Sequence, residues 1–181
     1  MNFKATKLVT LLITIIFFIG CSSDDSSDNA SSEKTNEFTF NGQSYELMTA
    51  WINDENTTTS DPSDIGFNLF NKSTADINSG NDLTGINYIY FDFTEVDLQE
   101  TTYTDILDYD VSINGTLING NFSPGTVFLS DDDPNADIYA SISTVTISDL
   151  TATTVNLTFS FTRNDGKVIS GAYSGNYTDP N

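Results

Sequence analysis

Apolar side chains recur at every second position over much of the chain after residue 36, and this period limits the fold more than any other feature. In residues 155–162, "VNLTFSFT", valine, leucine and two phenylalanines alternate with polar residues. Successive side chains of a β-strand point to opposite faces, so the pattern predicts a strand with one buried face. Similar alternations at residues 38–40 and 65–69 predict further strands of the same kind.

The other segments after residue 36 also indicate strands and turns. Residues 86–93, "INYIYFDF", are apolar at nearly every position, which is typical of a central strand covered on both sides. Asn41-Gly42 indicates a tight hairpin, and Asn164-Asp165-Gly166 indicates a turn before the last strand. We therefore expect an all-β domain over residues 37–178, a single antiparallel β-sandwich or flattened barrel of about eight to ten strands.

Residues 1–20 are expected to form a secretory signal peptide. Lys4 and Lys7 precede residues 8–19, which are apolar except for two threonines. As a helix this segment would extend about 18 Å, short of the roughly 30 Å core of a bilayer. A basic start followed by a short apolar stretch is typical of a signal peptide.

The residues around the single cysteine, Phe18-Ile19-Gly20-Cys21, resemble the lipobox of bacterial lipoproteins. The next residues, Ser22–Asp25, resemble the serine and acidic export signal of Bacteroidetes lipoproteins. This resemblance implies that the signal is cut before Cys21 and that acyl chains on Cys21 anchor the protein in the outer membrane, facing the cell exterior. Residues 21–36, rich in serine and acidic side chains, are expected to form a disordered tether.

Residues 143–177 resemble the closing meander of small Bacteroidetes lipoprotein domains of sandwich or lipocalin-like shape. The resemblance rests on two successive strands, an Asp-Gly turn and the sequence Gly-Ala-Tyr-Ser-Gly at residues 171–175. It implies a fold and a location, but it does not imply a particular chemical activity.

Charge and residue types exclude several classes of function. Without Lys4 and Lys7 the chain has 26 acidic and 4 basic residues, a net charge of −22. Such a surface repels phosphate groups, so nucleic acid is not an expected partner. The chain has no histidine and no cysteine besides Cys21, which excludes Ser-His-Asp and Cys-His catalysis, zinc sites of His or Cys type, and disulfides. We expect a protein that is not an enzyme.

One acidic loop, "DDDPNAD", is a candidate calcium site. Asp131, Asp133, Asn135 and Asp137 stand at alternating positions, and Ca²⁺ prefers such oxygen ligands. The loop lacks the glycine and the glutamate of an EF-hand, so an EF-hand is excluded. The alternative is a solvated acidic turn, which Asp-Pro-Asn chemistry favours. A weaker candidate set consists of Asp76, Asn78 and Asp82.

Aromatic and acidic side chains supply two further candidate sets. Trp51, Tyr103, Tyr109 and Tyr139 are candidates for a surface that stacks on sugar rings. Because Trp51 is in phase with the apolar residues before it at positions 45 and 47, packing in the core is favoured instead. Carboxylates in or after the predicted central strand are candidates for a glycosidase pair. They are Asp92, Glu95 and Glu100.

The expected function is that of a non-enzymatic cell-surface lipoprotein that binds or adheres to a glycan, a protein or a surface-assembly partner, with Ca²⁺ stiffening one loop. The alternative is a lipocalin-like carrier of a small apolar ligand, which requires a sealed cavity of roughly 300–1,000 Å³. A small glycosidase is the third class.

Overall fold

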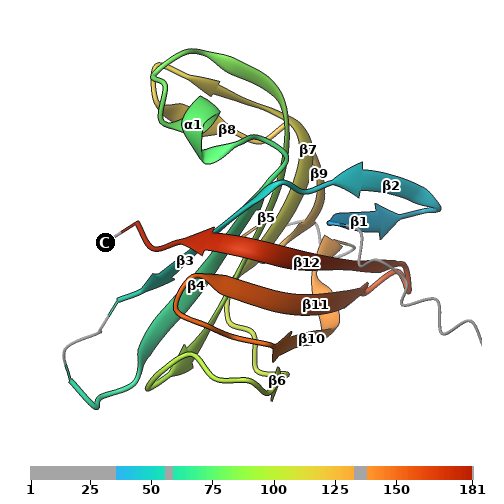
Figure 1. The fold of residues 1–181 in the computed structure, drawn as a ribbon. Coiled ribbons are helices and arrows are strands. Elements are labelled where there is room, and N and C mark those ends of the chain that lie inside the picture. Colours follow the sequence, from blue (N-terminus) through green and yellow to red (C-terminus); the bar gives the residue numbers. More distant parts are fainter. Residues whose placement is uncertain (1–35, 56–58, 133–137, 181) are drawn as a thin grey trace, which may run out of the picture. The chain divides into compact units, whose positions relative to one another are not determined.

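The computed structural model describes residues 36–55, 59–132 and 138–180, and these residues form an all-β unit (Figure 1). The predicted signal peptide, Cys21 and residues 21–35 of the tether lie outside the described residues. The strands are β1 (Glu37–Phe40), β2 (Gln43–Glu46), β3 (Thr49–Asp54), β4 (Ser63–Phe70), β5 (Leu83–Glu95), β6 (Thr102–Tyr103), β7 (Tyr109–Ile118), β8 (Asn121–Ser123), β9 (Thr126–Ser130), β10 (Ala140–Ser148), β11 (Thr154–Arg163) and β12 (Val168–Thr178).

The all-β class predicted from the sequence is confirmed. Twelve strands are present among the described residues, more than the eight to ten expected. The difference arises because elements such as β6, with two residues, and β8, with three, are too short to show a period of two. The turn predicted at Asn41-Gly42 joins β1 to β2, and both residues have positive φ angles, 51° and 76°, as a tight hairpin turn requires.

The helix among the described residues is α1 (Thr74–Ile77), which has a single turn. The side chain of Ser73 caps it by accepting a hydrogen bond from the backbone N–H of Asp76. Within the part of the chain that the structure describes, no helix is long and apolar enough to cross a membrane.

The described strands form one sheet in the order β6-β10-β11-β12-β3-β4-β5-β7-β8, with β1 paired to β12 and β2, and β9 paired to β7. Neighbours are antiparallel except β12 and β3, which pair in parallel where Tyr177 meets Ala50 and Thr178 meets Trp51. The order begins at β6 and ends at β8 without joining them, so the sheet is open, and this favours the sandwich over the flattened barrel.

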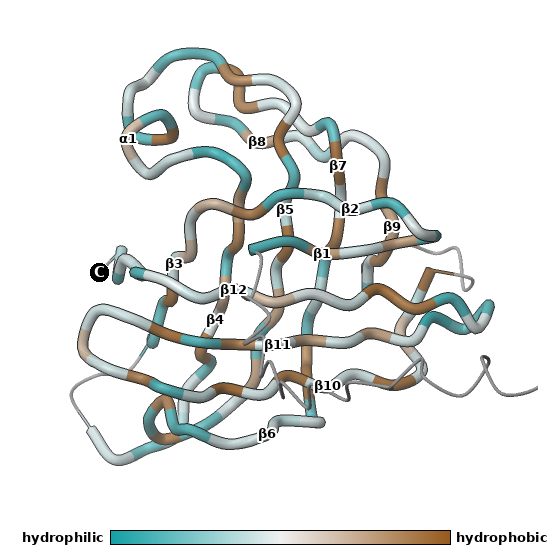
Figure 2. The backbone as a smooth tube through the Cα atoms, turned by 45° about the vertical axis from the view of Figure 1, so that its right-hand side comes forward, coloured by the Kyte–Doolittle hydropathy of each residue, from teal (hydrophilic) through white to brown (hydrophobic). Residues whose placement is uncertain are grey.

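Two halves of this sheet pack against each other through their apolar faces. In Figures 1 and 2, β10, β11 and β12 lie across β3, β4, β5 and β7. Phenylalanine rings fill the space between the halves: the ring of Phe91 on β5 lies 6.2 Å from those of Phe159 and Phe161 on β11. The alternating residues of β11 are buried as predicted, and Figure 2 shows the change of polarity along the strands.

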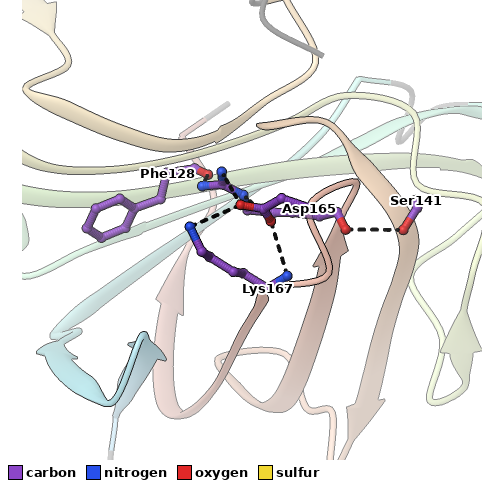
Figure 3. A network of polar contacts seen from close by, with 5 residues as sticks. Phe128, Ser141, Asp165 and Lys167 are labelled. Atoms are coloured by element: carbon purple, nitrogen blue, oxygen red, sulfur yellow. Dashed lines mark hydrogen bonds and ion pairs between the residues drawn. The ribbon is translucent and has the colours of Figure 1, made fainter. Parts of the chain in front are cut away.

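Arg163, the one arginine of the chain, supports this packing from the end of β11. Its guanidinium is buried, donates to the backbone oxygen of Phe128 at 2.7 Å and lies 5.3 Å from the centre of the Phe40 ring. Its Nε and Nη2 also donate to the two carboxylate oxygens of Asp165 at 3.2 and 3.0 Å. Lys167 contacts the same carboxylate at 3.1 Å, so the predicted turn carries a charged network (Figure 3). Burial opposes ionisation, but the hydrogen bonds from Lys167 and the charges of Arg163 and Lys167 lower the pKa of Asp165.

Candidate ligand-binding site

The outward face of β3, β4 and β5 gathers aromatic and polar side chains. Strand pairing places Trp51 beside Asn68, and Asn68 beside Tyr90. In the next row, Phe70 is paired with Tyr88. Because side chains alternate along each strand, these residues point away from the phenylalanine core.

Four rings on this face form a continuous row. Trp51 meets Phe70 edge to face with ring centres 5.4 Å apart, and Phe70 stacks on Tyr88 at 5.2 Å. The ring of Phe122, on β8, lies 4.8 Å from Tyr88. These rings line a pocket of about 230 Å³, here named the aromatic pocket. Its remaining lining residues are Asn68, Ile77, Ile86 and Leu117.

Two short elements form walls of the aromatic pocket. Ile77 comes from α1, and Figures 1 and 2 show α1 beside β8 at the same end of the sheet. The side chain of Thr74 receives a hydrogen bond of 3.5 Å from the indole nitrogen of Trp51, which joins α1 to β3. Phe122 can lie over β7 because residue 115 is glycine: a Cβ there would be 2.9 Å from the Phe122 ring. The aromatic pocket is therefore built from six elements: β3, β4, α1, β5, β7 and β8.

A second pocket, here named the polar pocket, adjoins the first and also has Asn68 as a lining residue. It has a volume of about 250 Å³. The other lining residues are Asn53, Glu55, Asp64, Gly66, Tyr90, Asp92 and Asp108. Each pocket alone is smaller than the roughly 300–1,000 Å³ of typical ligand sites. Since they share Asn68, they form two parts of one site along β4 and β5.

Hydrogen bonds hold the side chains of this site in place. The hydroxyl of Tyr88 donates to Oδ1 of Asn68 at 2.9 Å, and that of Tyr90 donates to Oδ2 of Asp92 at 2.7 Å. Oδ1 of Asp92 accepts the backbone N–H of Asp108 at 2.9 Å. Asp92 is 5% exposed, so both oxygens of a nearly buried carboxylate are engaged by the protein.

Burial and the negative charges in this region raise the pKa values of neighbouring tyrosine and aspartate side chains. Burial, then hydrogen bonding to Asp92 and its charge, raise the pKa of Tyr90, which therefore remains a donor. Burial, and after it the charge of Asp110, raise the pKa of Tyr88. Slight desolvation, a hydrogen bond with Asp131 and the charges of Asp92 and other aspartates raise the pKa of Asp108, which is exposed. Negative charge is thus concentrated at the polar pocket.

A larger open groove of about 720 Å³ lies along β1, β2 and β12. Its lining residues are Asn36, Glu37, Ser44, Glu46, Leu47, Met48 and Ser174. It has no aromatic side chain and few apolar ones, so it offers little area for a ligand to bury.

The predicted calcium loop is mostly outside the described residues. Asp133, Asn135 and Asp137 fall there, whereas Asp131 follows β9 and accepts the backbone N–H of Tyr109 at 3.4 Å. In the weaker set, Asp76 belongs to the cap of α1, and Asp82 accepts the backbone N–H of Asn119 at 3.0 Å. Over residues 36–55, 59–132 and 138–180, no three acidic side chains are arranged to hold a metal ion.

The aromatic candidates separate into two groups. Tyr103 and Tyr109 are buried in the core, where Tyr103 stacks on Phe93 with ring centres 3.8 Å apart. Tyr139 is half-buried and lines neither pocket of the site. Trp51 is half-buried on the outward face, so its assignment to the core was wrong. The strand is interrupted at residues 47 and 48, and the alternation starts anew in β3.

The acidic candidates for a glycosidase pair do not converge. Asp92 lies in the polar pocket. Glu95 accepts the backbone N–H of Val96 at 3.1 Å, and Glu100 accepts that of Leu150 at 2.7 Å. Neither glutamate lines the polar pocket.

The rest of the site was missed because residues 86–93 were expected to be covered on both faces. β5 is central, between β4 and β7, and its inward face is buried as expected. Its outward face carries Tyr88 and Tyr90, which line the two pockets. The signal was present, because the outward positions 88, 90 and 92 hold two tyrosines and an aspartate rather than aliphatic residues.

Comparisons of the chain with protein-family models, with curated proteins and with solved structures found no match, so the candidate site rests on its geometry alone.

Proposed function

We propose that this protein is a lipid-anchored, non-enzymatic glycan-binding protein of the bacterial cell surface. The observation that supports glycan binding best is the row of rings from Trp51 to Phe122 in a pocket that adjoins a polar one. A sugar ring has an apolar face of C–H groups and a rim of hydroxyls. An aromatic surface beside fixed polar groups complements both parts of such a ring.

A glycan fits this site better than a small apolar ligand does. The aromatic pocket has about 230 Å³, less than the roughly 300–1,000 Å³ of ligand cavities that enclose their ligand. Its edge at Asn68 continues into a pocket of carboxylates and amides, which an apolar molecule would leave without partners. Binding rather than catalysis is proposed because the chain has no histidine and the Asp92 carboxylate is already hydrogen-bonded on both oxygens.

Binding is measured through Trp51, the single tryptophan of the chain. We expect that a glycan array identifies sugars that bind the purified full chain, and that these sugars change Trp51 fluorescence on titration. Trp51→Ala should weaken binding by about thirtyfold or more in calorimetry, because central aromatic anchors contribute about 2 kcal/mol or more. Ile142→Ala, a substitution of a side chain 63% exposed on β10, is the control and should bind normally.

Two results would contradict the proposed glycan binding. The first is an array on which no glycan binds the full chain. The second is binding that Trp51→Ala leaves unchanged, since the sugar would then occupy another surface. Saturable binding of a fatty acid with a larger response of Trp51 fluorescence would favour the apolar carrier instead.

The anchoring part of the proposal is tested at Cys21. Cys21→Ala should abolish acylation and release the protein from the membrane fraction, because the acyl chains supply the membrane affinity. The measurement is incorporation of labelled palmitate together with cell fractionation, and Ser22→Ala is the matched control that should remain acylated. Protease added to intact cells should remove the domain. Acylated, membrane-bound Cys21→Ala protein is the result that would reject the lipid anchor.

A further inference from the structure

We infer that the polar pocket is the second subsite of the candidate site, beside the aromatic pocket, and that it binds a protonated amine. The ligand is then a glycan with free amino groups. This inference rests on the proposed glycan binding at the aromatic pocket and assigns the chemical class of that glycan. It is carried by the groups that line the polar pocket, by one buried acceptor without a partner, and by the position of the pocket beside the rings.

The lining of the polar pocket is made almost entirely of hydrogen-bond acceptors. Four carboxylates reach it from four segments: Glu55 after β3, Asp64 on β4, Asp92 on β5 and Asp108 before β7. No lysine or arginine is among its lining residues. The Tyr90 hydroxyl, a donor, is already used by Asp92. A ligand that supplies several donors and a positive charge matches such a lining.

Asn53 provides independent evidence that a donor is missing. Its side-chain oxygen Oδ1 is buried and has no hydrogen-bond partner among the described residues. Asn53 lies beside Gly66 in the β3–β4 pairing, and both line the polar pocket. A buried acceptor without a donor destabilises the unliganded protein, so a ligand N–H that reaches Oδ1 when the Asn53 side chain turns toward the pocket gains affinity.

An ammonium group suits the pocket better than a metal ion. Ca²⁺ requires six to eight converging oxygen ligands, and among the described residues no group of three acidic side chains has that arrangement. An ammonium group has three donors and can be satisfied by fewer acceptors. Desolvation first, and then a hydrogen bond with Asp131 and the charges of nearby carboxylates, raise the pKa of the exposed Asp108, and a bound cation would offset the part that comes from these charges.

The arrangement of the two pockets sets how the glycan lies. Asn68 borders both pockets, and Tyr88 and Tyr90 are successive outward residues of β5. One sugar ring therefore rests in the aromatic pocket, and the amine of the same or the next unit enters the polar pocket. The glycan runs along β4 and β5.

The test compares three trisaccharides with the same β-1,4-linked glucose backbone that differ at C2, where they carry a hydroxyl, an acetamido group or a free amine. Each is titrated into the full chain at a pH below the pKa of the sugar amine. We expect the amino trisaccharide to bind about tenfold or more tightly than the other two, because charge-assisted hydrogen bonds are about twice as strong as neutral ones. Added salt should weaken the amino trisaccharide alone.

Matched variants separate the two subsites. The double variant Glu55→Gln, Asp64→Asn removes two exposed charges from the polar pocket and should abolish the preference for the amine. The control Asp97→Asn, Asp105→Asn removes the same charge from exposed positions outside the pocket and should keep the preference. Phe122→Ala, in the aromatic pocket, should weaken all three sugars alike.

The results that would reject the amine subsite differ from those that would reject glycan binding itself. Equal affinity for the three trisaccharides, no binding of the amino trisaccharide, or a preference that survives Glu55→Gln, Asp64→Asn overturns the amine subsite. Tri-lysine binding as tightly as the amino trisaccharide overturns it as well, in favour of a basic peptide. The proposed glycan binding falls only if the glycan array is also negative or if Trp51→Ala leaves glycan binding unchanged.

Discussion

Replacement of Gly171 by alanine is expected to lower the free energy of unfolding by about 3 kcal/mol or more, at the upper end of what overpacking costs. A Cβ at this position on β12 would lie 2.5 Å from the Phe159 ring and 2.6 Å from the backbone oxygen of Glu37. It would also lie 2.8 Å from Cβ of Phe38, the residue of β1 that pairs with Gly171. A backbone atom of a paired strand cannot move without breaking the β1–β12 pairing.

The matched control for this prediction is Gly175→Ala, four residues along the same strand and on the same face. A Cβ at Gly175 would meet the Tyr173 side chain, with 3.2 Å to its hydroxyl oxygen, and a side chain can shift. We expect Gly175→Ala to change stability by less than about 1 kcal/mol. Thermal unfolding should show the Gly171→Ala midpoint lowered by roughly 6–12 °C. Equal midpoints for the two variants would mean that β1 does not pack on β12 as described.

Replacement of Phe91 by alanine is expected to cost about 3–5 kcal/mol, the usual range for a buried phenylalanine. Phe91 is fully buried and stacks on Phe67 with ring centres 4.9 Å apart. It also lies 6.2 Å from the rings of Phe159 and Phe161 on β11. The substitution therefore leaves a cavity at the contact between the two halves of the sheet.

Urea unfolding monitored by Trp51 fluorescence measures this effect. Trp51 lies on the opposite face of the sheet from Phe91, so the substitution does not remove a contact of the reporter itself. The control is Phe122→Ala, whose ring is 36% exposed on the three-residue strand β8. We expect Phe122→Ala to lose glycan affinity and to change stability by about 1 kcal/mol or less, and Phe91→Ala to show the reverse. A Phe91→Ala protein as stable as Phe122→Ala would contradict the core between β5 and β11.

The strands could be predicted because alternation belongs to each segment alone. Residues 155–162 read as a half-buried strand, and in β11 the apolar positions are buried. The Asn41-Gly42 hairpin was predictable for the same reason, since a tight turn depends on the backbone preferences of two residues. In each case the pattern and its structural consequence lie within about ten residues.

Trp51 shows where that reasoning fails. Its phase was counted from residues 45 and 47, as if one strand ran through all three positions. The chain leaves the strand after β2 and enters β3 at Thr49, so the count across the break has no meaning. Within β3 the inward residues are Ala50 and Ile52, and Trp51 points outward between them.

The sequence by itself determined the all-β class, the main strands, the tight turns and the acidic character of the chain, because each of these follows from local pattern or composition. Only the tertiary structure decided which strands became neighbours. Backbone pairing of β3 with β4 and of β4 with β5 sets the order β3-β4-β5, and packing of Phe91 against Phe159, far apart in the chain, covers their inward face. That order brings Trp51, Asn68 and Tyr90 side by side on the outward face. The candidate site therefore exists through long-range pairing, which no alternation within one segment specifies.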